Sequence, residues 1–177
     1  MSVANIEYHV VRSADEAAYK QFMTDLFAEG LAVLPDRGMG PTDEQWTEFF
    51  KRRRSDHSVL FIAEHEGRLI GGGGVGRIEQ PNREHSVSLA LNVSKEYRNQ
   101  GIGRMLLRHT LRWTSVTPAI ERIELEVTAN NPGAIHLYQA AGFSVEGIKR
   151  GALKKGDLVL DIVQMAIVGS SVRSPKL

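Results

Sequence analysis

The chain has 177 residues, a charged fraction of 24%, a hydrophobic fraction of 42% and a formal net charge of +1. This size and composition are typical of one globular domain with a substantial core. The near-neutral charge gives no indication of binding to nucleic acid or to a membrane surface. The lack of cysteine excludes disulfides, thiolate metal ligands and a cysteine nucleophile.

Targeting and metal-binding signals are also missing from the sequence. No apolar run is long enough to span a bilayer, and the first residues do not have the basic and apolar regions of a signal peptide. We therefore expect a cytoplasmic protein. The six histidines show no paired spacing of the kind that metal ligands have, so no metal site is expected.

The N-terminal part predicts a strand over residues 6–11 and a helix over residues 14–29 that stops at Gly30. Ser13 and Glu16 have the spacing of a capping box at the start of this helix. One helix face is expected to carry the buried side chains, namely Ala18, Tyr19, Phe22, Met23, Leu26 and Phe27.

An irregular segment with several prolines and glycines, residues 31–41, precedes a second helix. Thr42 and Gln45 form another capping box, and the helix carries three aromatic residues, Trp46, Phe49 and Phe50. It ends in the basic cluster 51–54. We interpret this cluster as a solvated helix end, where cations are favoured, because a nucleic-acid patch would need a wider basic face.

The other predicted strands alternate apolar and polar residues or are continuously apolar. They are expected at residues 58–64, 68–78, 86–93, 122–128, 143–148 and 158–167. Gly71, Gly73 and Gly76 formally match a dinucleotide-binding pattern, but no helix follows them. We interpret this run as a glycine-rich strand with a bulge or a close approach of another backbone or ligand.

The chain is organised around a strand at 86–93, a basic glycine turn at 98–103 and a helix at 104–113. The first amides of a helix have no partner within it and lie at the positive end of its dipole. Gly101 and Gly103 let another molecule approach the backbone closely. A phosphate or diphosphate is therefore the expected occupant. The spacing fits neither a P-loop nor a dinucleotide fingerprint, which argues against a nucleotide oxidoreductase.

Leu91-x-Val93, four further residues and Arg98-x-x-Gly101-x-Gly103 resemble the acetyl-CoA-binding signature of the GNAT superfamily of N-acetyltransferases. A second block, Asn131-x-x-Ala134-x-x-Leu137-Tyr138-x-x-x-Gly142-Phe143, resembles the other signature of that family. Together with the strand order, the resemblance spans about residues 58–167. It implies an α/β (α+β) fold with a mixed, mostly antiparallel, splayed sheet of about seven strands and helices on both faces.

The resemblance also implies a cofactor site for acetyl-CoA, whose pantetheine arm lies along the strand and whose diphosphate lies on the turn. The residues expected to bind it are Leu91, Asn92, Val93, Arg98, Asn99, Gln100, Gly101, Ile102, Gly103, Arg104, Asn131 and Tyr138. Asn131 can at the same time cap the helix that begins at Pro132. Gly142 and Phe143 are expected to end that helix.

The expected chemistry is direct transfer of the acetyl group from the thioester to a primary amine. A free backbone N–H of the strand can act as an oxyanion donor. The resemblance assigns the role of general acid to Tyr138, and from reference pKa values of about 10 for tyrosine and about 8.5 for a thiol we expect its proton donation to be downhill. Packing on the helix face is the alternative role of Tyr138.

Glu126 is the candidate general base, because a related branch that acetylates protein N-termini has its proton acceptor at this position. Glu124 shares its strand face. Both carboxylates can equally be solvent-side residues of an alternating strand. The segments 143–147 and 161–165 resemble the branch that acetylates amino acids and related small amines. A small-molecule amine is therefore the expected acceptor.

Two alternatives remain, a protein N-terminal acetyltransferase of the ribosomal-protein type and a non-catalytic acyl-CoA-binding module. Members of the family are often dimeric, so the resemblance includes a homodimer among the partners. We expect residues 1–168 to form a single domain and residues 169–177 to be a disordered polar tail.

Overall fold

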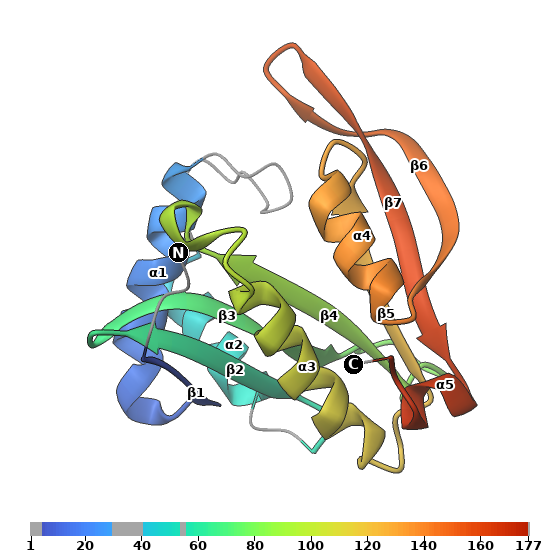
Figure 1. The fold of residues 1–177 in the computed structure, drawn as a ribbon, viewed down its shortest axis with the longest axis horizontal. Coiled ribbons are helices and arrows are strands. Elements are labelled where there is room, and N and C mark those ends of the chain that lie inside the picture. Colours follow the sequence, from blue (N-terminus) through green and yellow to red (C-terminus); the bar gives the residue numbers. More distant parts are fainter. Residues whose placement is uncertain (1–4, 30–40, 54–55, 177) are drawn as a thin grey trace.

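The computed structural model describes residues 5–29, 41–53 and 56–176. A seven-stranded sheet with the order β1-β2-β3-β4-β5-β7-β6 forms its centre, and helices cover both faces (Figure 1). The strands are β1 Ile6–Val10, β2 Val59–His65, β3 Arg68–Arg77, β4 Ser86–Val93, β5 Arg122–Thr128, β6 Ser144–Lys155 and β7 Leu158–Val168. The helices are α1 Glu16–Ala28, α2 Asp43–Arg53, α3 Ile102–Ser115, α4 Pro132–Ala140 and α5 Ser170–Arg173.

Two main apolar clusters hold the helices to opposite faces of the sheet. On one face, α1 and α2 contribute aromatic and aliphatic side chains that pack on Leu60, Ile62 and Leu69. On the other face, Leu107 and Leu111 of α3 share a core with α4, α5 and strands β3 to β5 and β7. The predicted mixed architecture with helices on both faces is confirmed.

The helix caps were partly predictable. The Thr42 N–H donates to Gln45 Oε1 at 3.0 Å and the Gln45 N–H donates to Thr42 Oγ1 at 3.3 Å, so this capping box is confirmed. The first helix begins later than expected, because a 3₁₀ turn over residues 13–15 precedes it and the Arg12 N–H donates to Asp15 Oδ2 at 2.7 Å.

The buried face of α1 consists of Tyr19, Phe22, Met23 and Leu26. Ala18 was wrongly placed on it, since this residue lies on the flank of the helix and is exposed. The predicted helix stop at Gly30, the irregular segment up to residue 40 and Arg54 lie outside the described residues.

The glycine-rich run is a strand, as predicted, and its glycines allow close packing on both sides. A Cβ on Gly74 would lie 2.0 Å from the Val59 carbonyl oxygen, and one on Gly72 would lie 2.8 Å from the Tyr19 ring. On the opposite face, a Cβ on Gly73 would come within 3.1 Å of Leu106 in α3. The glycines meet the sheet and both helices closely, which was one of the two expectations, and the other, a bulge, lies just before the run: the β2–β3 register shifts between Ala63 and Glu64, whose partners are Gly71 and Leu69.

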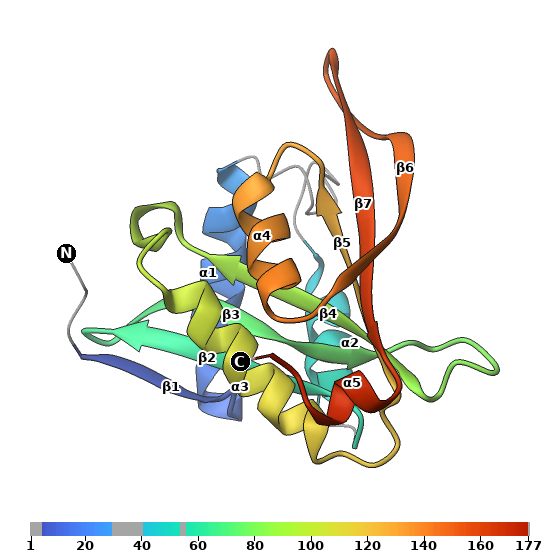
Figure 2. The ribbon, with the colours of Figure 1, turned by 45° about the vertical axis from the view of Figure 1, so that its right-hand side comes forward.

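Among the described strands, β4 and β5 form the one parallel pair, and they separate soon after they begin. Residues 86–88 pair with residues 122–124, whereas β4 continues to Val93 and β5 to Thr128. Figure 2 shows the two strands diverging from this short contact. The predicted splay of the sheet is therefore located after Ser88.

Two sequence expectations are wrong. Residues 170–173 form α5 where a disordered tail was predicted, because the Val172 side chain is fully buried in the core and Arg173 Nη1 donates to the Thr117 carbonyl oxygen at 2.7 Å. The basic cluster is not uniformly solvated: Lys51 and Arg52 are exposed, but Arg53 folds back onto β3. Among the described residues, no helix is both long and apolar enough to cross a membrane.

Candidate active site

The start of α3 has the geometry expected for an anion site. Gly101 is the N-cap residue with a φ of 85°, a left-handed conformation that favours glycine. The helix's first intrahelical hydrogen bond runs from the Met105 N–H to the Gly101 carbonyl oxygen at 3.0 Å. The amides of residues 102–104 precede it and have no acceptor within the helix. They therefore present donors, together with the positive end of the helix dipole, to the space in front of the turn.

Gly103 is a glycine for a different reason from Gly101. A Cβ at this position would lie 3.6 Å from Leu91 and 3.8 Å from Leu137, which are ordinary contacts. The fold itself thus has room for a larger residue here. The missing side chain instead leaves the backbone open toward the cavity that Gly103 lines.

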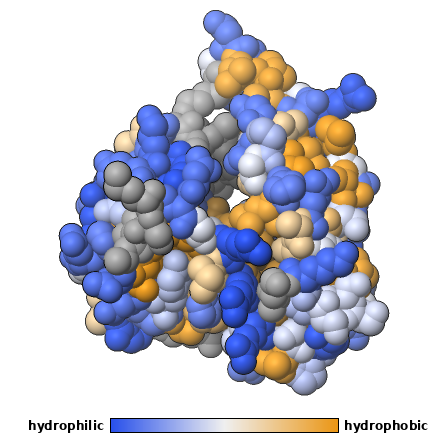
Figure 3. Space-filling view, in the orientation of Figure 1, coloured by the Kyte–Doolittle hydropathy of each residue, from blue (hydrophilic) through white to orange (hydrophobic). Residues whose placement is uncertain are grey.

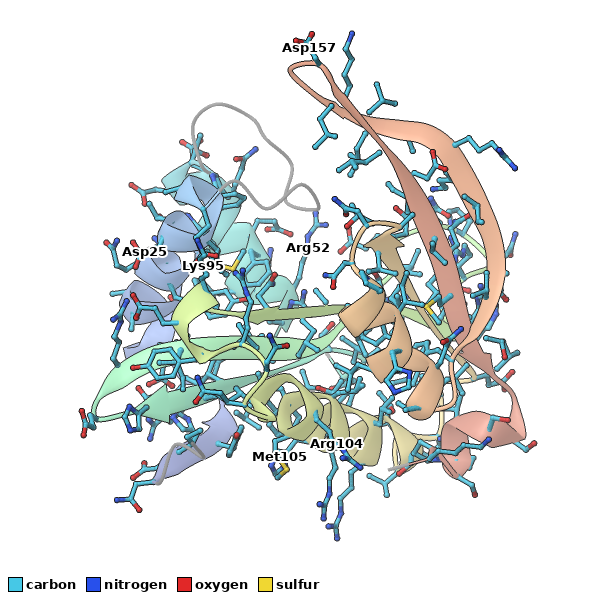
Figure 4. The ribbon with its side chains drawn as sticks, turned by 45° about the horizontal axis from the view of Figure 1, so that its top comes forward. Asp25, Arg52, Lys95, Arg104, Met105 and Asp157 are labelled. Atoms are coloured by element: carbon cyan, nitrogen blue, oxygen red, sulfur yellow. The ribbon has the colours of Figure 1, made fainter. Side chains whose placement is uncertain are left out.

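Arg98 is held in place by protein groups on both sides. Its Nε donates to the Val93 carbonyl oxygen at 2.9 Å, and its Nη2 forms an ion pair with Glu29 at the end of α1. Glu29 also accepts a hydrogen bond from the Lys95 N–H at 3.2 Å. Lys95 lies beside α1 in Figure 4. Arg98 thus ties the end of β4 to α1 while still lining the cavity.

The splay exposes particular backbone groups of β4. The Ser94 N–H bonds to the Ile70 carbonyl oxygen, and Val93, Asn92 and Leu91 are registered with Gly71, Gly72 and Gly73. Because hydrogen-bonded and non-bonded pairs alternate in an antiparallel ladder, Asn92 bonds to β3. The amides of Leu91 and Val93 then point toward β5, where the β4–β5 pairing has already ended. Within the described strands these two amides have no ladder partner, and they lie at the position predicted for an oxyanion site.

Helix α4 carries the second predicted motif and forms the opposite wall. Asn131 Oδ1 accepts a hydrogen bond from the Ala134 N–H at 3.1 Å, and Pro132 occupies the first turn, which confirms the predicted cap. Gly142 has a φ of 101° after the last turn. Phe143 packs edge-on against Tyr138 with ring centroids 5.7 Å apart.

The Tyr138 side chain is 6% exposed and lines the cavity. Burial raises the pKa of Tyr138 to about 12. The expectation of a downhill proton transfer is wrong, because the proton stays with the group of higher pKa and a thiol's reference value is about 8.5. Tyr138 is suited to donate a hydrogen bond while remaining neutral over the physiological pH range.

The two strand carboxylates occupy different environments. Glu126 is exposed at the cavity rim, where it pairs with Lys149 Nζ at 2.5 Å and accepts a hydrogen bond from Gln164 at 3.4 Å. Glu124 instead accepts hydrogen bonds from Arg83 at 2.6 Å and from Arg122 at 2.9 Å. Partial burial acts to raise the pKa of Glu124, but these two arginines outweigh it and hold the pKa below its usual value.

These elements enclose one cavity of about 510 Å³ between the diverging strands. Figure 3 shows a hollow in the middle of this face, with hydrophobic atoms at its base. Of the predicted site residues, the structure brings the following to the cavity wall: Leu91, Asn92, Val93, Arg98, Asn99, Gly101, Gly103, Arg104, Glu126, Asn131 and Tyr138.

Two predicted residues are not part of this wall. The Ile102 side chain is 1% exposed and packs into the core, and Gln100 Nε2 donates to the Glu96 carbonyl oxygen at 2.9 Å. Sequence reasoning missed Tyr97, Val127 and Gly133, which also line the cavity. Their position next to predicted motif residues was the available signal.

Comparison with known proteins identifies the class. A sequence model described as the Acetyltransferase (GNAT) family matches residues 20–143. L-amino acid N-acetyltransferase AaaT of Escherichia coli K12 is 30% identical over 129 residues, covering 72% of this chain and 78% of that protein. The [Ribosomal protein bS18]-alanine N-acetyltransferase of the same strain is 35% identical over 123 residues, covering 69% of this chain and 80% of that protein.

Solved structures show the same fold. A GNAT acetyltransferase from Streptococcus pneumoniae superposes with a TM-score of 0.83 at 23% identity, covering 93% of this chain and 99% of that chain. The yncA protein from Salmonella typhimurium, solved with acetyl-CoA, has a TM-score of 0.82 at 19% identity, covering 93% of this chain and 94% of that chain. The chain belongs to the GNAT family and is an acetyltransferase. This family uses acetyl-CoA as its acetyl donor.

The residues present fit this cosubstrate. The amides at the start of α3 provide donors for a diphosphate, and the free strand amides of Leu91 and Val93 lie along the expected course of an extended arm. No group of three or more metal-ligating side chains occurs within residues 5–29, 41–53 and 56–176.

Proposed function

We propose that the protein acetylates the primary amine of a small molecule, such as an amino acid or a related amine. The observation that carries the proposal is the convergence in one cavity of the α3 amides, the free β4 amides and Tyr138. A second cavity of about 350 Å³ shares Ala90 with it. Its volume suits a small ligand, and the similarity to an L-amino acid N-acetyltransferase supports the same acceptor class.

Each residue has a defined part in this reaction. The amides of residues 102–104 and Arg104 hold the diphosphate, and Arg98 keeps the turn in place. Leu91 and Val93 direct their N–H groups toward the thioester carbonyl oxygen as its charge develops. Asn131 caps α4, which holds Tyr138 at the cavity wall.

The protons balance across one turnover. The acceptor nitrogen forms a bond to the acetyl carbon, the carbon–sulfur bond breaks, the nitrogen loses a proton and the sulfur gains one. Glu126 takes the proton from the nitrogen, directly or through a water molecule. Tyr138 donates a hydrogen bond to the sulfur during bond cleavage, which stabilises the developing thiolate without requiring a free tyrosinate. The thiolate then takes its proton from water, and Glu126 releases to water the proton that it accepted.

The second candidate is acetylation of a protein N-terminus. The observation that favours it is the 35% identity to the bS18-alanine N-acetyltransferase over 69% of this chain. The sequence resemblance implies a proton acceptor at the position of Glu126 in that branch, and a carboxylate there is consistent with either activity.

One assay separates these functions. The purified protein is incubated with acetyl-CoA and a panel of amino acids, polyamines and peptides with free N-termini, and thiol release and product mass are followed. Turnover of small amines without turnover of peptides supports the proposal. Turnover of peptides alone would replace it with the protein-modifying function.

A further inference from the structure

Arg53, the last residue of α2, is packed between a ring and the sheet. Its guanidinium carbon lies 4.9 Å from the centre of the Phe49 ring. On the other side is Gly76 of β3, where a Cβ would come within 3.1 Å of Arg53 Nη1. A Cβ at position 76 would require the guanidinium to move by a few tenths of an ångström. The fold therefore holds this cation in a defined position over β3.

The charge of Arg53 has no counter-ion in the described part of the chain. Its Nη1 is enclosed and lacks a hydrogen-bond partner there. Burial lowers the pKa of Arg53, but an arginine keeps its proton in proteins. The neighbouring Arg52, in contrast, pairs with Glu48 at 2.9 Å and with Glu79 at 3.1 Å. An enclosed N–H group of a cation is costly to leave without an acceptor, so the unpartnered Nη1 of Arg53 favours an anionic ligand at this position.

Arg53 lines the second cavity, together with Phe49, Gly76, Ser88 and Ala90. Three further charged residues line it, Arg52, Arg77 and Glu79, and the Glu79 carboxylate is paired with Arg52 at 3.1 Å. Its neighbour Arg52 projects from α2 on the side that faces α4 and the β6–β7 hairpin, whose tip is marked by Asp157 (Figure 4). Ala90 also lines the cosubstrate cavity. The second cavity thus meets the proposed transfer site at one residue of β4.

A third cavity connects the same strand to the candidate base. It is lined by Ser88, Glu124 and Glu126. Gly76 is registered with Ser88, and Ser88 with Glu124, so the three residues lie in one row across the sheet. With neighbouring strands about 4.8 Å apart, Gly76 and Glu124 are separated by about 10 Å. The row therefore runs from Arg53, beside Gly76, to Glu124, whose charge is balanced by Arg83 and Arg122. Glu126, the candidate base, lies two residues further along the same face of β5.

We propose that Arg53 binds the carboxylate of the acceptor, and that the acceptor is a free α-amino acid whose amine faces the β4–β5 splay. This inference rests on the proposed small-amine function. An arginine fork matches a carboxylate with two hydrogen bonds. A peptide N-terminus carries an amide in place of that carboxylate, and a polyamine would bring a second cation toward Arg53. Both are therefore disfavoured as acceptors.

The test compares L-amino acids with their own amides as acceptors. The amide keeps the side chain and the amine but removes the negative charge. Values of kcat/KM are measured for both members of each pair with the wild type, Arg53→Gln and Arg53→Lys. Arg112→Gln, an exposed residue on α3, is the matched control for loss of one positive charge. The decisive quantity is the kcat/KM of the acid divided by the kcat/KM of its amide. Differences in the amount of folded enzyme cancel in this ratio.

We expect the wild type to prefer the acids, and Arg53→Gln to lower the acid-to-amide ratio by about 10- to 100-fold, as for loss of a hydrogen-bonded charge. Arg53→Lys should retain part of the preference and Arg112→Gln all of it. An unchanged ratio in Arg53→Gln, with turnover of small amines intact, would overturn this inference alone. Absence of turnover with every acid and amide would overturn the proposed function together with it.

Discussion

Arg98 and Glu29 form an ion pair that joins the turn before α3 to the C-terminal end of α1, 69 residues earlier in the chain. The same guanidinium donates to the Val93 carbonyl oxygen. The proposed diphosphate site is thus supported from outside the glycine turn. Arg98 can act on cosubstrate binding by positioning the turn as well as by its charge.

We expect Arg98→Ala to weaken acetyl-CoA binding by about tenfold, because it removes a charge-assisted hydrogen bond and the support of the turn. Glu29→Gln should weaken binding less, since Arg98 keeps its bond to Val93. Isothermal titration with acetyl-CoA measures both, with Arg112→Gln as the control. Unchanged affinity in Arg98→Ala would contradict the role of this residue.

Tyr138→Phe removes one hydroxyl from the cavity and should lower kcat by about 100-fold. The affinity for acetyl-CoA should change little, because α4 and its Asn131 cap stay in place. Steady-state kinetics and cosubstrate titration separate the two effects. If kcat is unaffected, Tyr138 has only a packing role against Phe143.

The pKa of about 12 also determines a pH dependence for Tyr138. The hydroxyl keeps its proton until the pH approaches this value. The ratio of wild-type kcat to that of Tyr138→Phe should therefore stay constant from pH 7 to 10.5, measured by mass spectrometry of the acetylated product. If the tyrosine had an ordinary pKa near 10, the ratio of wild-type kcat to the kcat of Tyr138→Phe would fall about fourfold by pH 10.5, because most of the hydroxyl would be deprotonated.

Glu126→Gln should lower kcat/KM at neutral pH by about 100-fold if the carboxylate accepts the amine proton. Lys149→Gln is the informative control, because it breaks the same ion pair but leaves the carboxylate at the cavity rim. That pair is exposed and contributes about 0–1 kcal/mol to stability. Equal, small effects of both changes on kcat/KM would show that Glu126 is only a salt-bridge partner.

Glu124→Gln should act on stability. The lowered pKa of Glu124 means that its stabilisation is fully present above its ordinary value of 4.5 and is lost as the pH falls through its folded value. We expect the variant to be less stable by about 1–2 kcal/mol at pH 7, with the difference narrowing below pH 4.5. Urea denaturation at a series of pH values measures this. If the difference in free energy of unfolding between the wild type and Glu124→Gln does not depend on pH, the stabilising role of the Glu124 carboxylate is contradicted.

Much of the fold could be predicted because its signals are local. The Thr42–Gln45 cap, the Asn131 cap and the left-handed Gly101 depend on neighbours within a few residues, and alternation placed the strands. The two carboxylates of β5 looked alike in sequence. They differ because Arg83, from a distant loop, reaches Glu124 and not Glu126.

The position of Arg53 could not be read from its own segment either. A basic run at a helix end favours solvation, and the contact that overrides it comes from a glycine on another strand. Helix α5 is likewise ordered because the Val172 side chain is buried in the core. In both cases a tertiary contact outweighs the local composition.

The short parallel contact between β4 and β5 has a mechanical consequence. Strands β1–β4 and β5–β7 are each joined by long antiparallel ladders, but three registered pairs join the two groups. Bending stiffness across the sheet is therefore lowest at this seam. A cosubstrate arm that bonds to Leu91 and Val93 would brace the seam, so that the loaded protein is stiffer than the free one along the line where the two substrates meet.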